Sequence, residues 1–425
     1  MQLNEPTRTP LPSIVVVAPW VFHLRCGIGG GVLCFRLLKS LAAHYSIHWV
    51  SFDTTTNDVE AGKTALREFC ASVTTVPLPA PQPRWRLRAR QLLGGPPVPA
   101  QVMESREMED TIKTVIARSS AIAALFQFPQ VAQYIRAGSA VPTIMDTQDV
   151  STVSIYRQWR KAGSTKRRII DGLNWLSWAR YEMRHYATAD LLLALSETDA
   201  GVLRAFWADV PCVLSPVATE VPPQVARGPG SYVAMVGNYF HPPNVDGLHW
   251  LLSEVWPQVR AQMPDAQLRV AGPQCPPQTP ELLAQGVHMT GFVDNIDAFF
   301  DGAAVSVCPY RFGGGIKIKV IEALARACPV VATSVGAEGL GAVDGQHLAV
   351  ANGTRAFADA IVSLLRDPAT ARNLGESGRA HVAQNFSFQS KTLQLMTEIN
   401  ALAARRRHAL PQPAAQAALA REAMP

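Results

Sequence analysis

Residues 310–322 read Tyr-Arg-Phe-Gly-Gly-Gly-Ile-Lys-Ile-Lys-Val-Ile-Glu, and the apolar run 303–309 lies directly before them. The apolar run predicts a buried strand, and the spacing of the apolar residues after Gly315 predicts a helix. Consecutive glycines between a strand and a helix let a ligand approach the backbone, and the free N–H groups of the helix start attract anions. We therefore expect an anion to bind at this turn.

The charged residues of the same stretch indicate which anion. Lys317 and Lys319 are expected in the first helical turn, where the helix dipole disfavours each cation by about 0.3–1 kcal/mol. A bound anion would explain two lysines there, and Glu322, about one turn later, could accept hydrogen bonds from a ribose. The stretch thus predicts a nucleotide diphosphate site. The alternative is a flexible turn followed by an ordinary surface pair between Lys319 and Glu322.

Length and composition bound the possible classes of protein. A chain of 425 residues suggests two domains of about 200 residues each. An apolar content of 48% with 17% charged residues is typical of a globular protein. No apolar run reaches the ~20 residues of a membrane-spanning helix. The first twelve residues lack a signal core, and the seven cysteines form no zinc spacing, so we expect a cytoplasmic protein.

Strand and helix patterns alternate twice along the chain, which predicts an α/β protein with parallel sheets. The expected parts are a tail at 1–12, a first domain at 13–228, a second domain at 229–390, and a C-terminal helix with a disordered tail at 391–425. The Pro- and Gly-rich segment 222–230 is the expected linker. In the second domain, a helix over 245–262 is expected to begin at Asn244 as its N-cap and to kink at Pro257.

Three further segments carry a resemblance to a known family. Residues 232–246 (Tyr-Val-Ala-Met-Val-Gly-Asn-Tyr-Phe-His-Pro-Pro-Asn-Val-Asp), 291–294 (Gly-Phe-Val-Asp) and 329–339 (Pro-Val-Val-Ala-Thr-Ser-Val-Gly-Ala-Glu-Gly) occur in order around the glycine turn. Residues 230–390 closely resemble the second domain of GT-B glycosyltransferases, family 4 in particular. The resemblance implies two Rossmann-like domains whose parallel sheets face each other across a cleft. The nucleotide sugar would bind the second domain and the acceptor mainly the first.

Together with the residues of the glycine turn, the resemblance implies a donor site. Its expected members are Gly30, Gly31, Gly237, Asn238, Phe292, Val293, Tyr310, Gly313, Gly314, Gly315, Lys317, Lys319 and Glu322. Gly30 and Gly31 belong to a first glycine cluster, 27–31, which follows the first strand. Together with Asp53, that cluster could indicate a dinucleotide site, but the sixth position of its GxGxxG pattern is Val32. A plain tight turn is the other alternative.

The sequence departs from the family pattern at two places. Family members hold two glutamates eight positions apart. Here Glu322 matches the second glutamate. Tyr310 takes the place of the first glutamate, and this chain then has three more residues between the two positions than the family pattern has. The family also places an arginine and a lysine after the first strand of the second domain, and residues 237–244 contain neither. Our hypothesis is that Lys317 and Lys319, with Arg311 assisting, have taken over neutralisation of the diphosphate.

Catalysis is expected to be metal-independent, because positioned cations and helix N-termini can stabilise a leaving diphosphate. The resemblance implies retention of anomeric configuration. Asp146 and Asp149 follow a strand end in the first domain and are the candidates for a base, although Asp149 is the better candidate for a helix cap. No cofactor is expected beyond the nucleotide-sugar donor.

Cations also gather in the first domain, where Arg84, Arg86, Arg88 and Arg90 lie beside Trp85, and the segment from Arg157 to Arg168 places cations beside Trp159. Such stretches favour an anionic membrane surface and a lipid-linked acceptor over nucleic acid. A solvated helix face is the alternative.

The sequence as a whole predicts a hexosyltransferase that acts on a glycan or lipid-linked acceptor in polysaccharide or cell-envelope biosynthesis. A nucleotide-sugar epimerase of the same fold and a nucleotide-sugar-binding protein without catalysis are the alternatives. A dehydrogenase fits least well.

Overall fold

The computed structural model describes residues 10–24, 29–54, 59–148, 150–160, 164–215, 217–223, 228, 230–313 and 316–409. The chain divides into two compact units. Unit 1 combines Met1–Pro216 with Thr392–Pro425, and unit 2 is Val217–Lys391.

Unit 1 is built on a seven-stranded parallel sheet with the order β3-β2-β1-β4-β5-β6-β7. Five of the six residues of β1 are buried, as expected for a strand whose two faces are both covered by helices. The strands are β1 (Ser13–Ala18), β2 (Ser46–Phe52), β3 (Ser72–Val76), β4 (Ala123–Gln127), β5 (Thr143–Asp146), β6 (Leu191–Ala194) and β7 (Cys212–Leu214).

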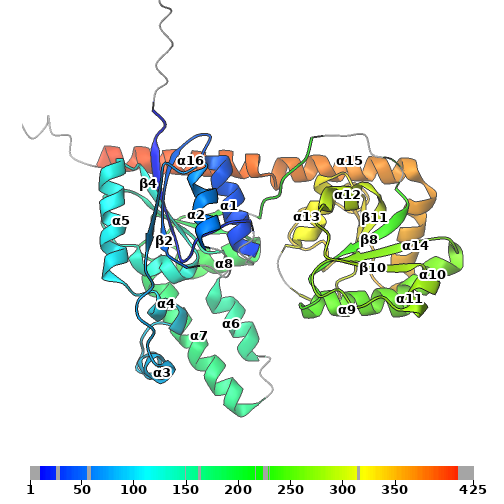
Figure 1. Ribbon diagram of the computed structural model, residues 1–425, viewed down its shortest axis with the longest axis horizontal. Coiled ribbons are helices and arrows are strands. Elements are labelled where there is room, and N and C mark those ends of the chain that lie inside the picture. The colour runs from blue at the N-terminus through cyan, green and yellow to red at the C-terminus, as the bar shows by residue number, and fades with distance from the viewer. Residues whose placement is uncertain are drawn as a thin grey trace, which may run out of the picture. The chain divides into compact units, whose positions relative to one another are not determined.

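Helices of unit 1 cover this sheet and extend beyond it (Figure 1). They are α1 (Gly29–Leu41), α2 (Val59–Arg67), α3 (Arg84–Leu92), α4 (Val98–Val102), α5 (Arg106–Ser119), the 3₁₀ helix η1 (Pro129–Tyr134), α6 (Ser151–Arg160), α7 (Thr165–Tyr186), α8 (Glu197–Phe206) and α16 (Phe388–Ala409). Serine N-caps begin three of them, because a serine hydroxyl satisfies a free N–H of the first turn: Ser105 for α5, Ser164 for α7 and Ser196 for α8.

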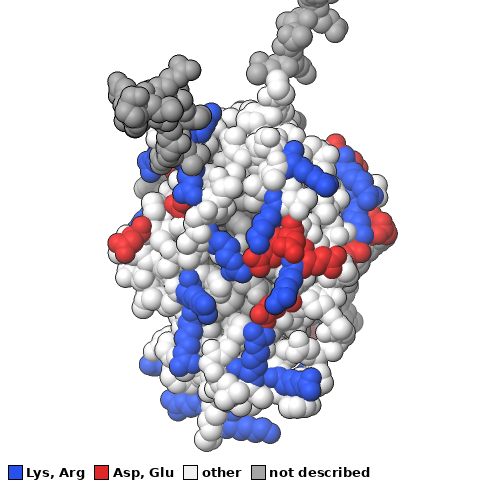
Figure 2. Space-filling view, turned by 90° about the vertical axis from the view of Figure 1, so that its left-hand side faces the viewer, with Lys and Arg blue, Asp and Glu red and all other residues white. Residues whose placement is uncertain are grey.

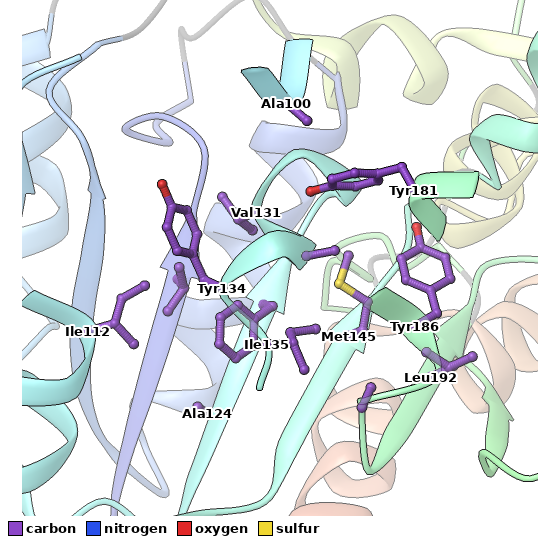
Figure 3. Packing of buried hydrophobic residues seen from close by; sticks show 14 of the residues in the cluster. Ala100, Ile112, Ala124, Val131, Tyr134, Ile135, Met145, Tyr181, Tyr186 and Leu192 are labelled. Atoms are coloured by element: carbon purple, nitrogen blue, oxygen red, sulfur yellow. The ribbon is translucent and has the colours of Figure 1, made fainter. Parts of the chain in front are cut away.

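Three buried tyrosines attach η1 and α7 to one face of this sheet (Figure 3). Tyr181 donates to the carbonyl of Gln130 at 3.1 Å, and Tyr134 donates to the carbonyl of Met103. The third, Tyr186, packs in the same cluster as Met145 of β5. Each ring thus buries apolar area while its hydroxyl is hydrogen-bonded, which is how tyrosine is tolerated inside a core.

From Thr392 on, the last helix of the described chain belongs to unit 1, although the whole of unit 2 separates it in sequence from the other elements of that unit. Tyr45 donates to Asn400 Oδ1 at 3.2 Å, and Thr392 Oγ1 donates to Ser40 Oγ at 2.8 Å. Gln394 Nε2 donates to the carbonyl of Leu214 at 2.6 Å. These contacts attach α16 to α1, β2 and β7.

Unit 2 contains a six-stranded parallel sheet with the order β10-β9-β8-β11-β12-β13. The strands are β8 (Tyr232–Val236), β9 (Leu268–Ala271), β10 (Val287–Gly291), β11 (Ala303–Cys308), β12 (Val330–Ala332) and β13 (Ala349–Val350). The helices are α9 (Pro242–Trp250), the π-helix η2 (Leu251–Val255), α10 (Trp256–Gln262), α11 (Pro280–Ala284), α12 (Ile296–Asp301), α13 (Ile318–Ala325), α14 (Thr354–Arg366) and α15 (Pro368–Asn385). Apolar clusters cover both faces of the sheet.

The helix expected over 245–262 begins earlier than predicted, and its α-helical pattern is broken beside Pro257, as expected. It begins at Pro242 with His241 as N-cap, so the assignment of Asn244 as N-cap was wrong. Prolines 242 and 243 suit the first turn because their missing N–H groups would have no partner there. The interruption lies in the turn before Pro257, where the wider π-helix η2 replaces the α-helical pattern.

The predicted α/β class with two parallel sheets is confirmed, and both sheets share the same topology. In each, the first strand lies beside the second on one side and beside the fourth on the other, so the strand order reverses between β1 and β4 and between β8 and β11. Doubly wound sheets bind ligands at the carboxyl ends of the two strands at that reversal. Among the described helices, none combines the length and apolarity needed to cross a bilayer.

The close packing of α15 on α13 gives a test of the fold. A Cβ added at Gly375 of α15 would lie 2.2 Å from the carbonyl oxygen of Ala327, whereas one added at Gly201 of α8 would have no atom within 4 Å. Gly375→Ala should destabilise unit 2 by about 1–3 kcal/mol through overpacking. The matched change Gly201→Ala should stabilise by about 0.5–1 kcal/mol, because alanine is the better helix former. Thermal unfolding followed by circular dichroism measures both, and equal effects would contradict the packing described here.

Candidate functional site

The strand-order reversal of unit 2 places two loops side by side, one after β8 and one after β11. Gly237 and Asn238 follow β8, and Tyr310 lies two residues beyond the end of β11. Thr333, which follows β12, donates its hydroxyl hydrogen to the carbonyl of Tyr310 and accepts from the N–H of Gly336 at 3.0 Å. The loop after β11 is therefore held from the next strand of the sheet.

Lys319 lies at the centre of this region. Its Nζ donates to Asn244 Oδ1 at 2.6 Å and to the hydroxyl of Tyr310. The pKa of Lys319 is lowered to about 8, chiefly by burial and to a smaller extent by Lys317, while Cys308 and Glu322 act in the opposite direction. Burial also raises the pKa of Tyr310, so its hydroxyl stays protonated. Lys319 is therefore a cation with a large desolvation cost.

Lys317 is the second cation of this region. It is the N-cap residue of α13, which begins at Ile318, so only Lys319 lies in the first helical turn. The expectation that both lysines lie inside the helix was wrong for Lys317. Its side chain is 6% exposed, and its Nζ lies 3.5 Å from Glu338 Oε2. No role was predicted for Glu338 from the sequence, although it lies in a segment that resembles the family.

Asn244 joins the loop after β8 to this cluster. Its Nδ2 donates to the carbonyl of Asn238 at 2.6 Å while its Oδ1 accepts from Lys319. A Cβ at Gly237 would lie 3.0 Å from Asn244 Oδ1, so only a glycine at this position leaves the amide undisturbed. Asn244 is thus a member of the site, although the sequence pattern had indicated that it caps the N-terminus of a helix. Its position directly after two prolines gave no sign of this role.

Arg311, proposed as an assisting cation, is occupied elsewhere. Its guanidinium makes two hydrogen bonds to the carboxylate of Asp246 on α9, Nε to Oδ2 at 2.8 Å and Nη2 to Oδ1 at 2.5 Å. This pairing lowers the pKa of Asp246, and it balances the charge of the arginine. Lys319, whose hydrogen-bond partners Asn244 and Tyr310 are neutral, is therefore a better candidate than Arg311 for anion neutralisation.

The remaining predicted donor residues of unit 2 lie around the same edge of the sheet. Gly313 has a φ of +115°, a conformation that favours glycine. Phe292 and Val293 follow β10, with Phe292 70% exposed and Val293 packed against the core. Glu322 is a half-buried residue of α13. Gly314 and Gly315 lie outside the described residues.

Predicted site residues of unit 1 lie at the corresponding edge of its sheet. Gly30 and Gly31 are in the first turn of α1, and a Cβ at Gly30 would lie 2.9 Å from the ring of Phe128. Phe128 follows β4 with a φ of +72°, which is unusual outside glycine. This close packing explains why the position requires a glycine.

Asp146 is fully buried at the end of β5, where its Oδ1 accepts from the N–H of Gln148 at 3.3 Å. It does not cap α6, because Glu182 accepts from the first two N–H groups of that helix, those of Ser151 and Thr152. The sequence could not show this cap, since 31 residues separate Glu182 from Ser151. Asp149 lies outside the described residues.

A cavity of about 860 Å³ lies at the opposite edge of the unit 2 sheet, where β8 and β11 begin. Tyr232 and Ala303, the first residues of those strands, line it together with Arg326, Arg372 and Arg379. We place the candidate site at the carboxyl edge instead, because ligands of doubly wound sheets bind there and Lys317 and Lys319 lie there. Within the described residues, no group of three or more His, Cys, Asp or Glu could hold a metal ion.

Part of the sequence is similar to known proteins. Residues 230–367 match the family model of glycosyl transferases group 1. A protein of the cps region of Klebsiella pneumoniae is 29% identical over 163 residues, which are 36% of this chain. The match spans 42% of that relative's length.

Solved structures are similar over most of the chain. The sucrose-phosphate synthase of Thermosynechococcus elongatus has a TM-score of 0.62 at 17% identity, over 92% of this chain and all of that one. HepE of Anabaena, solved with UDP, has a TM-score of 0.61 at 12% identity, again over 92% and 100%. WaaG, a glycosyltransferase involved in lipopolysaccharide biosynthesis, has a TM-score of 0.55 at 13% identity, over 91% and 99%. The chain therefore has the GT-B fold, and its residues 230–367 are similar to the glycosyl transferases group 1.

Proposed function

We propose that this protein is a hexosyltransferase that moves a sugar from a nucleotide diphosphate to a glycan or lipid-linked acceptor in polysaccharide or cell-envelope biosynthesis. The observation that carries the proposal is a pair of cations at the strand-order reversal of unit 2: Lys317 is buried, and Lys319 is half-buried with a lowered pKa. Burying a cation is costly unless an opposite charge compensates it. Lys317 already lies 3.5 Å from Glu338 Oε2, whereas the hydrogen-bond partners of Lys319, Asn244 and Tyr310, are neutral. A diphosphate bound beside the loop would provide an opposite charge for Lys319.

The comparisons support this choice of donor and acceptor. HepE has been solved with UDP and with UDP-glucose, and WaaG acts in lipopolysaccharide biosynthesis. The Klebsiella relative is a protein of a cps region. We place the nucleotide beside Gly237, Asn238 and the 313–315 glycines, with Glu322 accepting from ribose hydroxyls.

In the proposed reaction, the bond between the anomeric carbon and the diphosphate oxygen breaks, and the acceptor hydroxyl bonds to that carbon with retention. Negative charge grows on the leaving oxygen, so cations that are already positioned stabilise the transition state more than the ground state. Lys317 and Lys319 would supply this stabilisation without a metal ion. Asp146 and Asp149 remain the proposed candidates for a base.

A panel of nucleotide sugars tests the proposal directly. We expect one donor to release nucleoside diphosphate only when an acceptor glycan or glycolipid is present, and the rate to stay unchanged with a chelator of divalent ions. Interconversion of the sugar without transfer would identify an epimerase. Tight donor binding without turnover would identify a binding protein, the outcome that the tyrosine in place of the family's first glutamate favours.

The two lysines should matter for turnover more than for folding. Lys317→Ala and Lys319→Met should lower kcat by about 10²–10³ in at least one case, as does the loss of a donor that stabilises developing charge. The matched control is Arg355→Ala, which removes a cation of unit 2 whose side chain is 90% exposed. It should leave kcat unchanged. Full turnover in both lysine variants would assign diphosphate neutralisation to other residues.

The lowered pKa of Lys319 predicts how donor affinity depends on pH. Above pH 8 the free protein loses the Lys319 proton, so binding of a nucleoside diphosphate should weaken by roughly tenfold per pH unit if it requires the cation. Isothermal titration calorimetry on either side of pH 8 measures this, and Lys319→Met should bind weakly with no such slope.

Stability should change in the opposite direction and so serves as the control. An unfolded lysine keeps its proton up to its ordinary pKa of 10.5, whereas folded Lys319 loses it near 8. Between these values the unfolded chain binds more protons, so the contribution of Lys319 to the free energy of unfolding rises with pH. A fall in both affinity and stability above pH 8 would indicate general alkaline unfolding and contradict the role of Lys319.

A further inference from the structure

One end of unit 1 exposes apolar side chains among cations. In α3, Leu87 and Gln91 are buried, while Trp85 is 68% and Leu92 62% exposed. Leu93, which follows the helix, is 89% exposed. Residues 85, 88, 89 and 92 recur at helical spacing, so the outward face of α3 combines tryptophan, leucine and arginine. Large apolar residues in such a group are unusual on a protein surface that faces only water.

The N-terminal half of α7 shows the same combination. Ile169 is 60% exposed, and Ile170, Leu173 and Leu176 are each more than a third exposed. Lys166, Arg167 and Arg168 are exposed beside them. The two helices are in contact, since Gln91 Nε2 of α3 donates to Asn174 Oδ1 of α7 at 3.1 Å. We call the exposed residues of α3 and the first half of α7, together with Leu93, the basic apolar end.

Few negative charges offset these cations. α3 contains no acidic residue, and the two acids of α7, Asp171 and Glu182, are both buried. Arg90 pairs with Glu104 and Arg167 with Asp171, but no ion pair is found for Arg84, Arg86 or Arg88 within the part of the chain described. In Figure 1, α3 and the first half of α7 lie at the lower end of unit 1, and on the face shown in Figure 2 the charged side chains visible at that end are cationic.

Trp159, which the sequence pattern grouped with this surface, is part of the packing between α6 and α7. Its ring stacks on that of Trp175 with a centroid distance of 5.4 Å and an interplanar angle of 15°. Its Nε1 would lie 3.1 Å from a Cβ at Gly172. The side chain of Arg157 is outside the described part of the structure. The apolar residues available to a partner are therefore those of α3 and α7.

We propose that the basic apolar end binds the surface of an anionic lipid bilayer. Tryptophan and leucine would enter the boundary between headgroups and acyl chains, and the arginines would contact lipid phosphates while their stems remain on the apolar boundary. Each cation near an anionic membrane contributes about fivefold to the partition coefficient. Nucleic acid fits less well, because exposed leucine and isoleucine gain nothing from a phosphate backbone. The proposal does not depend on the proposed glycosyl transfer.

Flotation of the full-length protein with lipid vesicles, without donor or acceptor, tests this. At low salt we expect binding to phosphatidylcholine vesicles that contain phosphatidylglycerol, little binding to phosphatidylcholine alone, and release by high salt. Arg84→Gln with Arg86→Gln should lower the partition coefficient roughly 30-fold. Leu92→Ser with Leu93→Ser should lower it by on the order of tenfold or more, because the apolar area is lost.

Matched controls show whether a loss of binding comes from this particular surface or only from a lower net charge or fewer exposed apolar residues. Arg67→Gln with Arg118→Gln removes the same charge from exposed positions of α2 and α5, and Leu393→Ser removes a 53% exposed leucine of α16. Both should bind as the wild type does. Absence of wild-type binding, or equal losses in the controls, would overturn the proposal. So would RNA binding that the arginine variant loses and the leucine variant keeps, since that result would assign the surface to nucleic acid.

Discussion

The candidate site depends on the half-buried ammonium group of Lys319. It joins three parts of unit 2 that are far apart in sequence: Asn244 of α9, Tyr310 after β11, and the first turn of α13. A cation removed from water requires polar partners on every side, so the surrounding loops are arranged around it. Position 237 requires a glycine because a Cβ there would crowd the Asn244 amide.

The same cation links stability to function. Its neighbours compensate its desolvation incompletely, as the pKa of about 8 shows. A site with an uncompensated positive charge gains when an anion arrives, and gains more when that anion becomes more negative during bond cleavage. An incompletely compensated charge lowers the stability of the free protein, and such charges are common at sites that bind and turn over charged substrates.

The two units contribute different surfaces to the same proposed task. Unit 2 carries Lys317 and Lys319 at the reversal of its sheet, and unit 1 carries a helical end where leucine, isoleucine and tryptophan are exposed among arginines. A transferase that takes its donor from solution and its acceptor from a bilayer requires both surfaces. The helix α16 attaches to unit 1 through Tyr45 and Ser40, so this unit includes the end of the described chain.

The sequence by itself determined the α/β class, most strands, the glycine turn and the choice of Lys317 and Lys319, because hydrophobic period and glycine runs are local signals. Only the tertiary structure decided the partners of those lysines. Asn244 and Glu338 lie 75 and 21 residues from the lysines they contact, and no local pattern records such a distance. The cap of α6 by Glu182 and the packing of Trp159 on Trp175 likewise depend on neighbours from another helix, so propensity and spacing could not reveal them.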